Sequence, residues 1–300
     1  MFSLRSLRIK AMQYLFASFI QQKVEGIKAE DISLSPRDIK KIRQHLTDGI
    51  EAIHHLHSTF LQLMTSWAMI EKERASRLME SPATPLYDDP LLTDLRLDPS
   101  FAVMCKRYPI FFSVDRVERW YDGYINRPEI SLKREEGSED KTFLVRDLVK
   151  YIFKEREIQE KSAQQDMGWQ EDRGIVLQRL RRFIKDFAHT PEESFALYDE
   201  SISADKVDFY VELITKTWQS VEEHTTLLQE KVDNWSLERI NVLDRTLIIM
   251  ALTEIKYFPE IPTKVSINEY LEIAKQYSTP KSVAFINGVV DSVSKGSGSV

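Results

Sequence analysis

VLDRTLIIMALTEI, at residues 242–255, is the stretch of sequence that decides the fold. It contains neither glycine nor proline, and its apolar side chains lie on nearly every side of a helical projection. Such a pattern predicts a helix that is buried almost all round. We therefore expect this helix to be the most buried element of a helical bundle, with the remaining helices packed around it.

Helical patterns also dominate the chain outside this segment. Apolar residues recur at spacings of three and four over residues 4–22 and, after the helix-start signal Ser35-Pro36, without a break to Leu78. Further helices are predicted at residues 143–159, 170–187 and 205–231. With only 9 glycines and 11 prolines, the chain lacks the turn residues of an all-β protein. The sequence predicts an all-α fold in which the long helix packs against the helices at 143–159 and 170–187.

The region between residues 82 and 142 lacks the long helical patterns found in the rest of the chain. Five prolines punctuate it as far as Pro109, which indicates loops and short helices. Its many aromatic residues are interpreted as core filling under long loops rather than as a platform for stacking bases, because aromatic residues that stack on RNA normally lie with basic residues on a defined sheet or groove. The charged tract Lys133–Lys141 is the best candidate for a mobile loop, and residues 294–300 read as a flexible tail.

Composition limits the classes of function. A length of 300 residues allows two core-forming units or one domain with a large insertion, and the net charge of −6 argues against a protein that coats nucleic acid generally. A local basic patch does exist, because Arg5, Arg8 and Lys10 lie in a start that lacks acidic residues. The single cysteine, Cys105, fits a reducing compartment, and no apolar run is long enough for a membrane span. We expect a cytoplasmic protein without a membrane partner.

Motifs for catalysis and metal binding are absent from the sequence. His54 and His57 share a helix face, but no ligand set at metal spacing joins them, so we interpret them as surface or half-buried side chains. The sequence has no phosphate-binding glycine loop and no nucleophile elbow, and Cys105 has no histidine near it in the sequence. We predict a protein that is not an enzyme and that uses no metal or cofactor.

Several blocks near the C-terminus carry a family resemblance. They are Leu243-Asp244-Arg245 at a helix start, then PTKVSINE at 262–269, then Ala274-Lys275, and finally FINGVV at 285–290. In order and spacing these blocks resemble the NusB transcription-antitermination family. The first helix is also similar, with Arg8, Ala11, Gln13, Leu15 and Phe16 at expected positions.

The resemblance covers about residues 1–21 and 207–293 and implies two bundles of helices. We accordingly divide the chain into an N-terminal helix of the NusB-like fold at 1–34, an inserted helical region at 35–204, a C-terminal NusB-like bundle at 205–293, and the tail. The family implies binding of boxA-like single-stranded RNA from ribosomal RNA operons together with the NusE-type ribosomal protein. It also implies a place in the antitermination complex of RNA polymerase.

The resemblance also implies the site residues. Those expected to bind RNA are Arg5, Arg8, Lys10, Phe16, Lys264 and Lys281, and those expected to bind the partner are Asn268, Glu269, Phe285, Asn287 and Gly288. The start is less basic than the family pattern, because Leu4 and Ser6 stand where arginine is common, as does Ile249 in the central helix.

Two further expectations concern polar residues and glycine in apolar surroundings. Gly288 inside a helix costs about 1 kcal/mol relative to alanine, so we expect a neighbouring helix to approach it closely. Asn268 and Asn287 either form buried pairs that fix helix register or contact RNA or a partner.

Two alternative functions stay open at this point. One is the RNA-binding domain of an rRNA methyltransferase, which would need a catalytic domain after Val300. The other is an interaction protein that keeps the fold but has lost RNA binding, which the sparse arginine start allows.

Overall fold

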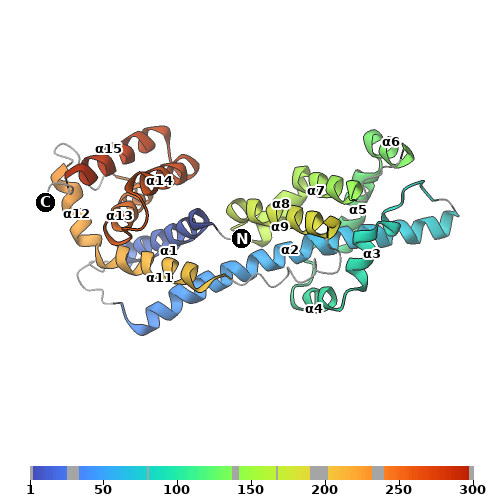
Figure 1. Ribbon diagram of the computed structural model, residues 1–300, viewed down its shortest axis with the longest axis horizontal. Coiled ribbons are helices and arrows are strands. Elements are labelled where there is room, and N and C mark those ends of the chain that lie inside the picture. Colours follow the sequence, from blue (N-terminus) through green and yellow to red (C-terminus); the bar gives the residue numbers. More distant parts are fainter. Residues whose placement is uncertain are drawn as a thin grey trace. The chain divides into compact units, whose positions relative to one another are not determined.

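The computed structural model describes residues 3–25, 34–79, 81–136, 142–166, 168–189, 202–231 and 240–296 (Figure 1). Within these residues the secondary structure is helical and contains no strand, which confirms the all-α prediction. The chain forms two compact units. The terminal unit comprises Phe2–Asp48 and Ile202–Val300, and the central unit comprises Gly49–Ser201.

The terminal unit is a bundle built around α13 (Val242–Tyr257). Residues 246–254 of this helix are buried throughout, and α1, α11, α12, α14 and α15 all contact it. The expectation that this helix is the most enclosed element of a bundle is therefore confirmed. The surrounding helices are α1 (Leu4–Glu25), α11 (Ala204–Gln219), α12 (Val221–Lys231), α14 (Thr263–Tyr277) and α15 (Pro280–Gly296).

Polar side chains set the ends of these helices. Asn241 accepts a hydrogen bond from the backbone N–H of Leu243 at 3.0 Å and so begins α13. The hydroxyl of Thr279 accepts from the N–H of Ser282 at 3.2 Å and begins α15, as the Thr279-Pro280 signal predicts. The buried carboxylate of Asp244 accepts from Ser278 Oγ at 2.6 Å, which ties the start of α13 to the segment before α15.

The long helix α2 (Pro36–Leu78) contributes to both units, and its bounds confirm the predicted helix. The sequence placed the boundary of the inserted region at residue 35, whereas the units divide at residue 49, inside α2. The reason is that the first turns of α2 belong to the terminal bundle. Ile42 and Leu46 are buried there, and His45 Nδ1 lies 2.6 Å from the hydroxyl of Tyr210 on α11.

The central unit contains the rest of α2 and a series of shorter helices. These are η2 (Leu86–Asp88), α3 (Pro90–Leu97), α4 (Pro99–Arg107), α5 (Val114–Ile125), α6 (Pro128–Glu136), α7 (Phe143–Lys154), α8 (Arg156–Gln165) and α9 (Trp169–His189). Aromatic side chains fill its core, as expected. Phe60 on α2 packs against Phe153 on α7 and Trp169 on α9, with ring centroids 5.4 and 5.5 Å away. These contacts confirm the predicted partners of the long helix.

A buried ion pair completes this core. The carboxylate of Glu71 on α2 accepts from Arg134 Nη2 of α6 at 2.6 Å, from the Tyr121 hydroxyl of α5 at 3.0 Å, and from the Leu86 N–H of η2 at 2.5 Å. Both charged side chains are buried. One carboxylate therefore joins four separate segments of the central unit.

Two predicted helices are each divided in the structure. The helix predicted at 143–159 becomes α7 and α8, which meet at Glu155, and the helix predicted at 205–231 becomes α11 and α12, which meet at Ser220. The predicted loop at Lys133–Lys141 lies partly outside the described residues, since α6 continues to Glu136, and the last residues of the predicted tail lie outside them too.

Candidate nucleic-acid interface

The first helix carries the cationic side chains that the sequence singled out. Arg8 on α1 points at Glu254 on α13 and forms two hydrogen bonds with it, from Nε to Oε2 and from Nη2 to Oε1, each 2.7 Å long. Arg8 is 2% exposed and the side chain of Glu254 is 0% exposed. This two-bond pair therefore belongs to the interior of the terminal unit.

Two side chains of α14 share the same carboxylate. Ser266 Oγ donates to Glu254 Oε1 at 2.6 Å, and the hydroxyl of Tyr270 donates to Oε2 at 3.1 Å. Burial lowers the pKa of Arg8, but the hydrogen bonds and charge of Glu254 outweigh it, so that the pKa is raised overall. Arg8 remains charged and connects α1 to α13 and α14. Its guanidinium is engaged in the fold.

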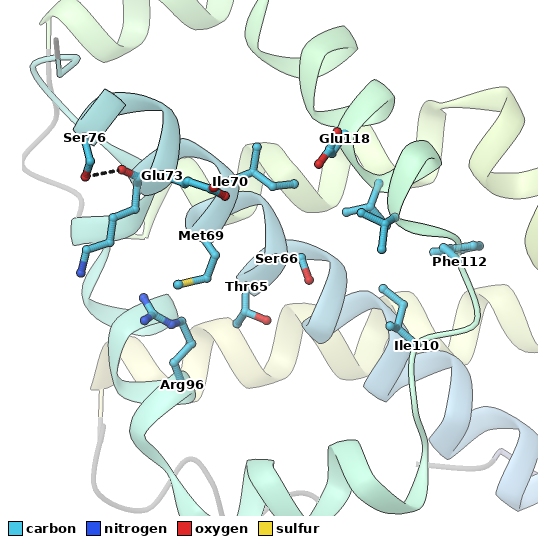
Figure 2. Close-up of a pocket in the computed structure, with 13 residues that line it drawn as sticks. Thr65, Ser66, Met69, Ile70, Glu73, Ser76, Arg96, Ile110, Phe112 and Glu118 are labelled. Atoms are coloured by element: carbon cyan, nitrogen blue, oxygen red, sulfur yellow. Dashed lines mark hydrogen bonds between the residues drawn. The ribbon is translucent and has the colours of Figure 1, made fainter. Parts of the chain in front are cut away.

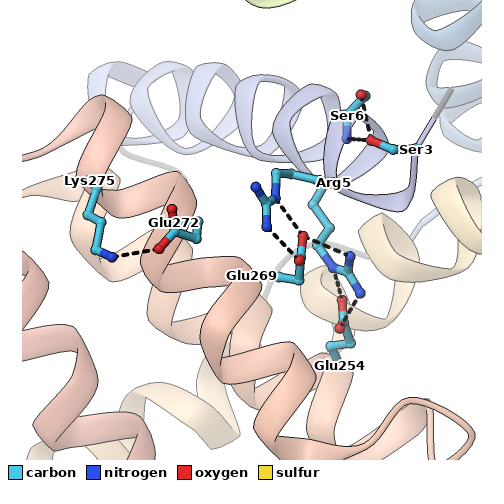
Figure 3. Close-up of polar contacts among 8 residues, drawn as sticks. Ser3, Arg5, Ser6, Glu254, Glu269, Glu272 and Lys275 are labelled. Carbon is cyan, nitrogen blue, oxygen red and sulfur yellow. Dashed lines mark hydrogen bonds and ion pairs between the residues drawn. The ribbon is translucent and has the colours of Figure 1, made fainter.

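Arg5 lies one turn earlier on α1, at the edge of the same arrangement (Figure 3). Its Nε and Nη2 donate to the two carboxylate oxygens of Glu269 on α14 at 2.8 and 2.7 Å. The exposed fractions are 47% for Arg5 and 20% for Glu269, so this pair is open to solvent. The hydrogen bonds from Arg5 are the main reason why the pKa of Glu269 lies below its ordinary value.

The other predicted RNA-binding residues of α1 are less open. Lys10 is buried, and its positive charge adds to burial in lowering the pKa of His45 on α2. Phe16 is half-buried. Of the four α1 residues predicted to bind RNA, Arg5 is the one that the structure leaves exposed.

The predicted residues of α14 and α15 are mostly at the surface. We call the exposed ones the α14–α15 set; they are Lys264, Asn268, Lys281, Asn287 and Gly288. Phe285 is half-buried. Lys264 and Asn268 stand one turn apart on α14, and Lys281, Phe285 and Gly288 follow the helical repeat on α15. Because α14 contacts α15, the two helices present these residues from adjoining elements.

One expectation about these residues is wrong, and one of two open alternatives is excluded. Gly288 was expected to meet a neighbouring helix closely, but a Cβ added there would have no heavy atom within 4 Å. That expectation is wrong, because Gly288 occupies the exposed side of α15 while Val289 and Val290 supply its packing. Asn268 and Asn287 are likewise exposed, so they are not buried pairs that fix helix register.

Sequence reasoning did not identify Glu254, Ser266 and Tyr270 as partners of Arg8. One signal was available, since Glu254 is an acidic residue within a helix that is otherwise apolar nearly all round. A buried carboxylate requires a cation or several donors, and here the basic helix α1 supplies the cation.

Two kinds of feature are absent from the described ranges. No group of three His, Cys, Asp or Glu side chains lies close enough to hold a metal ion. Among the same residues, none of the helices combines the length and the apolar character needed to cross a bilayer.

Comparison with known proteins identifies relatives of the chain. The model of the NusB family matches residues 170–295. The transcription antitermination protein NusB of Methylacidiphilum infernorum is 33% identical over 151 residues, which cover 49% of this chain and 94% of that protein. The NusB proteins of Salinibacter ruber and Chloroherpeton thalassium are 45% and 42% identical over 29% and 28% of this chain, which spans 54% and 40% of their lengths. No solved structure matches the chain.

Proposed function

The chain belongs to the NusB family, and from this premise we propose that it is a non-catalytic antitermination factor. In this proposal it binds boxA-like single-stranded RNA of ribosomal RNA operons jointly with a NusE-type ribosomal protein. The complex would act on RNA polymerase. The α14–α15 set and Arg5 form the proposed contact surface.

Gly288 is the observation that carries the proposal. A glycine within a helix lowers its stability by about 1 kcal/mol relative to alanine, and no close contact inside the protein offsets that cost. An exposed glycine lets a base or another backbone come close to the helix. The fold does not need this glycine, whereas a ligand lying on α15 would.

The other members of the set supply suitable chemistry. Lys264 and Lys281 are exposed cations that can hold phosphates, and the amides of Asn268 and Asn287 can both donate to and accept from bases or peptide groups. The half-buried ring of Phe285, one turn before Gly288, is an aromatic side chain on which a base can stack.

Arg5 can join this surface by changing partners. Its ion pair with Glu269 is exposed, and such pairs contribute only about 0–1 kcal/mol to stability. A phosphate can therefore replace Glu269 at little cost, and the released carboxylate is then free to bind a donor of the protein partner. We assign Arg8 to the framework that holds α1 in place, because its guanidinium is buried.

Titration of boxA-like RNA, with and without the NusE-type protein, tests the proposal. We expect weak binding by the chain alone and tighter binding with the partner. Lys264→Ala and Lys281→Ala should each lower the slope of log affinity against log salt by about 0.7. Lys150→Ala, an exposed lysine on α7 of the central unit, is the matched control and should leave the slope unchanged.

A second candidate is a scaffold that binds the protein partner but not RNA. The burial of Arg8 and Lys10 favours it, since two of the three cations near the chain start are withdrawn from the surface. Binding of the NusE-type protein without any contribution from RNA would select this function over the first.

A further inference from the structure

A cavity of about 610 Å³ lies in the central unit, outside the surface discussed so far (Figure 2). The helix α2 supplies one side, from Thr65 to Ser76. At 1.5 Å per residue this length is about three turns, or roughly 16 Å. Residues of α3, of α5 and of the segment before α5 line the rest. The cavity is therefore an elongated groove that runs along a helix.

The floor of this groove is rigid and apolar. The ring of Phe112 is buried and lies edge-on to Trp120, with centroids 4.8 Å apart. Val117 is also buried, and its carbonyl accepts a hydrogen bond from Trp67 Nε1 at 2.9 Å. These contacts fix the floor within the aromatic core. Binding of a ligand would therefore cost little conformational entropy in these side chains.

Large apolar side chains remain exposed beside the floor. Met69 on α2 is 45% exposed, and Val114 at the start of α5 is 71% exposed. Both line the groove. Isolated exposed apolar residues are common, but several next to a preformed apolar floor are typical of a binding surface.

Charged residues of both signs surround this apolar strip. Lys72 and Arg96 provide positive charge, and Glu118 provides negative charge. Figure 2 shows Arg96 and Glu118 on opposite sides of Ser66 and Thr65. No ion pair within the described residues engages Lys72, Arg96 or Glu118, whereas Glu73 is already bonded to Arg77 at 2.5 Å. One edge of the groove thus offers positive charge to acidic groups, and the other offers the negative charge of Glu118, which also acts on Arg74, to basic groups.

We propose that this groove binds an amphipathic α-helix of a partner protein. The length of about three turns, the apolar floor and the opposite charges at its edges match a helix whose apolar stripe has an acidic flank and a basic flank. An RNA strand fits less well, because Glu118 would repel its phosphates. The site lies in the central unit and is independent of the proposed RNA contact.

Synthetic helical peptides of three to four turns provide the test. Three peptides share the same apolar stripe. The first has one acidic and one basic flank (mixed flanks), the second has two acidic flanks and the third has two basic flanks. A fourth peptide has mixed flanks, but the order of its apolar residues is scrambled. In fluorescence polarisation with the full chain, the peptide with mixed flanks should bind at least threefold more tightly than the peptides with two acidic or two basic flanks. The scrambled peptide should not bind. Equal binding of scrambled and intact stripes would overturn the proposal.

Substitutions in the chain test whether the peptide binds in this groove. Val114→Asp should weaken the mixed-flank peptide at least tenfold, and Met69→Glu gives the same test on α2. Val103→Asp is the matched control, since Val103 on α4 is 66% exposed and does not line the groove. The double variant Lys72→Glu, Arg96→Glu should transfer the preference to the peptide with two basic flanks. Thermal unfolding confirms that each variant is folded.

Two outcomes would contradict the assignment. If Val103→Asp weakens the peptide as much as Val114→Asp does, the peptide does not occupy the groove. The other outcome is a dimer in sedimentation that dissociates in the Val114→Asp variant but persists in the Val103→Asp variant. In that case a second copy of this chain, and not a partner helix, occupies the groove.

Discussion

Arg8 and Glu254 are 246 positions apart in the sequence, and their side chains form a two-bond ion pair in the interior of the terminal unit. Ser266 and Tyr270 add hydrogen bonds to the same carboxylate. Removing Arg8 leaves the buried carboxylate of Glu254 without its counter-ion, although these two hydrogen bonds remain. We expect Arg8→Ala to lower the free energy of unfolding by about 3–5 kcal/mol in urea titrations.

Arg5→Ala is the control for that variant, because it removes an arginine one turn away whose ion pair is exposed. It should change the free energy of unfolding by no more than about 1 kcal/mol. Equal losses for the two variants would show that burial does not distinguish the two pairs.

Glycine substitutions give opposite expectations at two helix positions. Gly288→Ala should raise the stability of the terminal unit by up to about 1 kcal/mol, because a Cβ meets nothing there. The same change at Gly123 of α5 would place a Cβ 2.7 Å from the hydroxyl of Tyr151, which is held in the aromatic core. It should cost about 1–3 kcal/mol. Denaturant midpoints measure both effects.

Gly288→Ala also tests function apart from stability. If a ligand lies on α15, the variant should bind RNA or the NusE-type protein less tightly although it is more stable. A variant that gains stability and keeps full affinity for both would mean that the glycine serves neither contact.

His57 predicts a specific sensitivity to acid. Burial, together with the charges of Arg179 and His54, lowers its pKa from 6.5 to about 3. Below pH 6.5 the unfolded chain therefore binds a proton that the folded chain does not, so stability falls as the pH drops from 6.5 towards 3. This single group should remove about 2 kcal/mol between pH 7 and pH 5.

Urea unfolding of the chain and of His57→Gln at both pH values checks this expectation. The variant should lose less stability than the parent on acidification, whatever its stability at pH 7. An identical loss in the parent and in His57→Gln would mean that another group causes the acid response.

Arg5→Ala adds a test of the RNA surface. The variant should lower the salt slope for boxA-like RNA by about 0.7, as expected for one lost phosphate contact to a single strand. Glu269→Gln should raise RNA affinity, since it frees Arg5 and removes a negative charge. Unchanged slopes in both variants would place the phosphates elsewhere.

Much of the fold could be predicted from local patterns. The spacing of apolar residues identified α2 and α13, and the Thr279-Pro280 signal marked the start of α15. The breaks at Glu155 and Ser220 were not predicted, because neither glycine nor proline marks them in the sequence. The division inside α2 depends on contacts with distant residues such as Tyr210, which periodicity does not contain.

The candidate site was harder to predict for the same reason. Family resemblance selected Arg5 and Arg8 alike, and both are arginines on one helix. Only the packing of α1 on α13 decides that Arg8 is enclosed while Arg5 stays open. The exposure of Gly288 was also hidden, since a glycine among apolar residues suggests close packing until its side of the helix is known.

Glu71 has a consequence for how the inserted region could be gained or lost. Its carboxylate is compensated by donors 15, 50 and 63 positions further along the chain. A shortened region that lacks Arg134 would bury the carboxylate of Glu71 without its counter-ion. A shortened region that lacks Glu71 would bury the guanidinium of Arg134 without its counter-ion. Partial deletions of this region are therefore less viable than its removal as a whole, and natural variation in its length should occur in its loops.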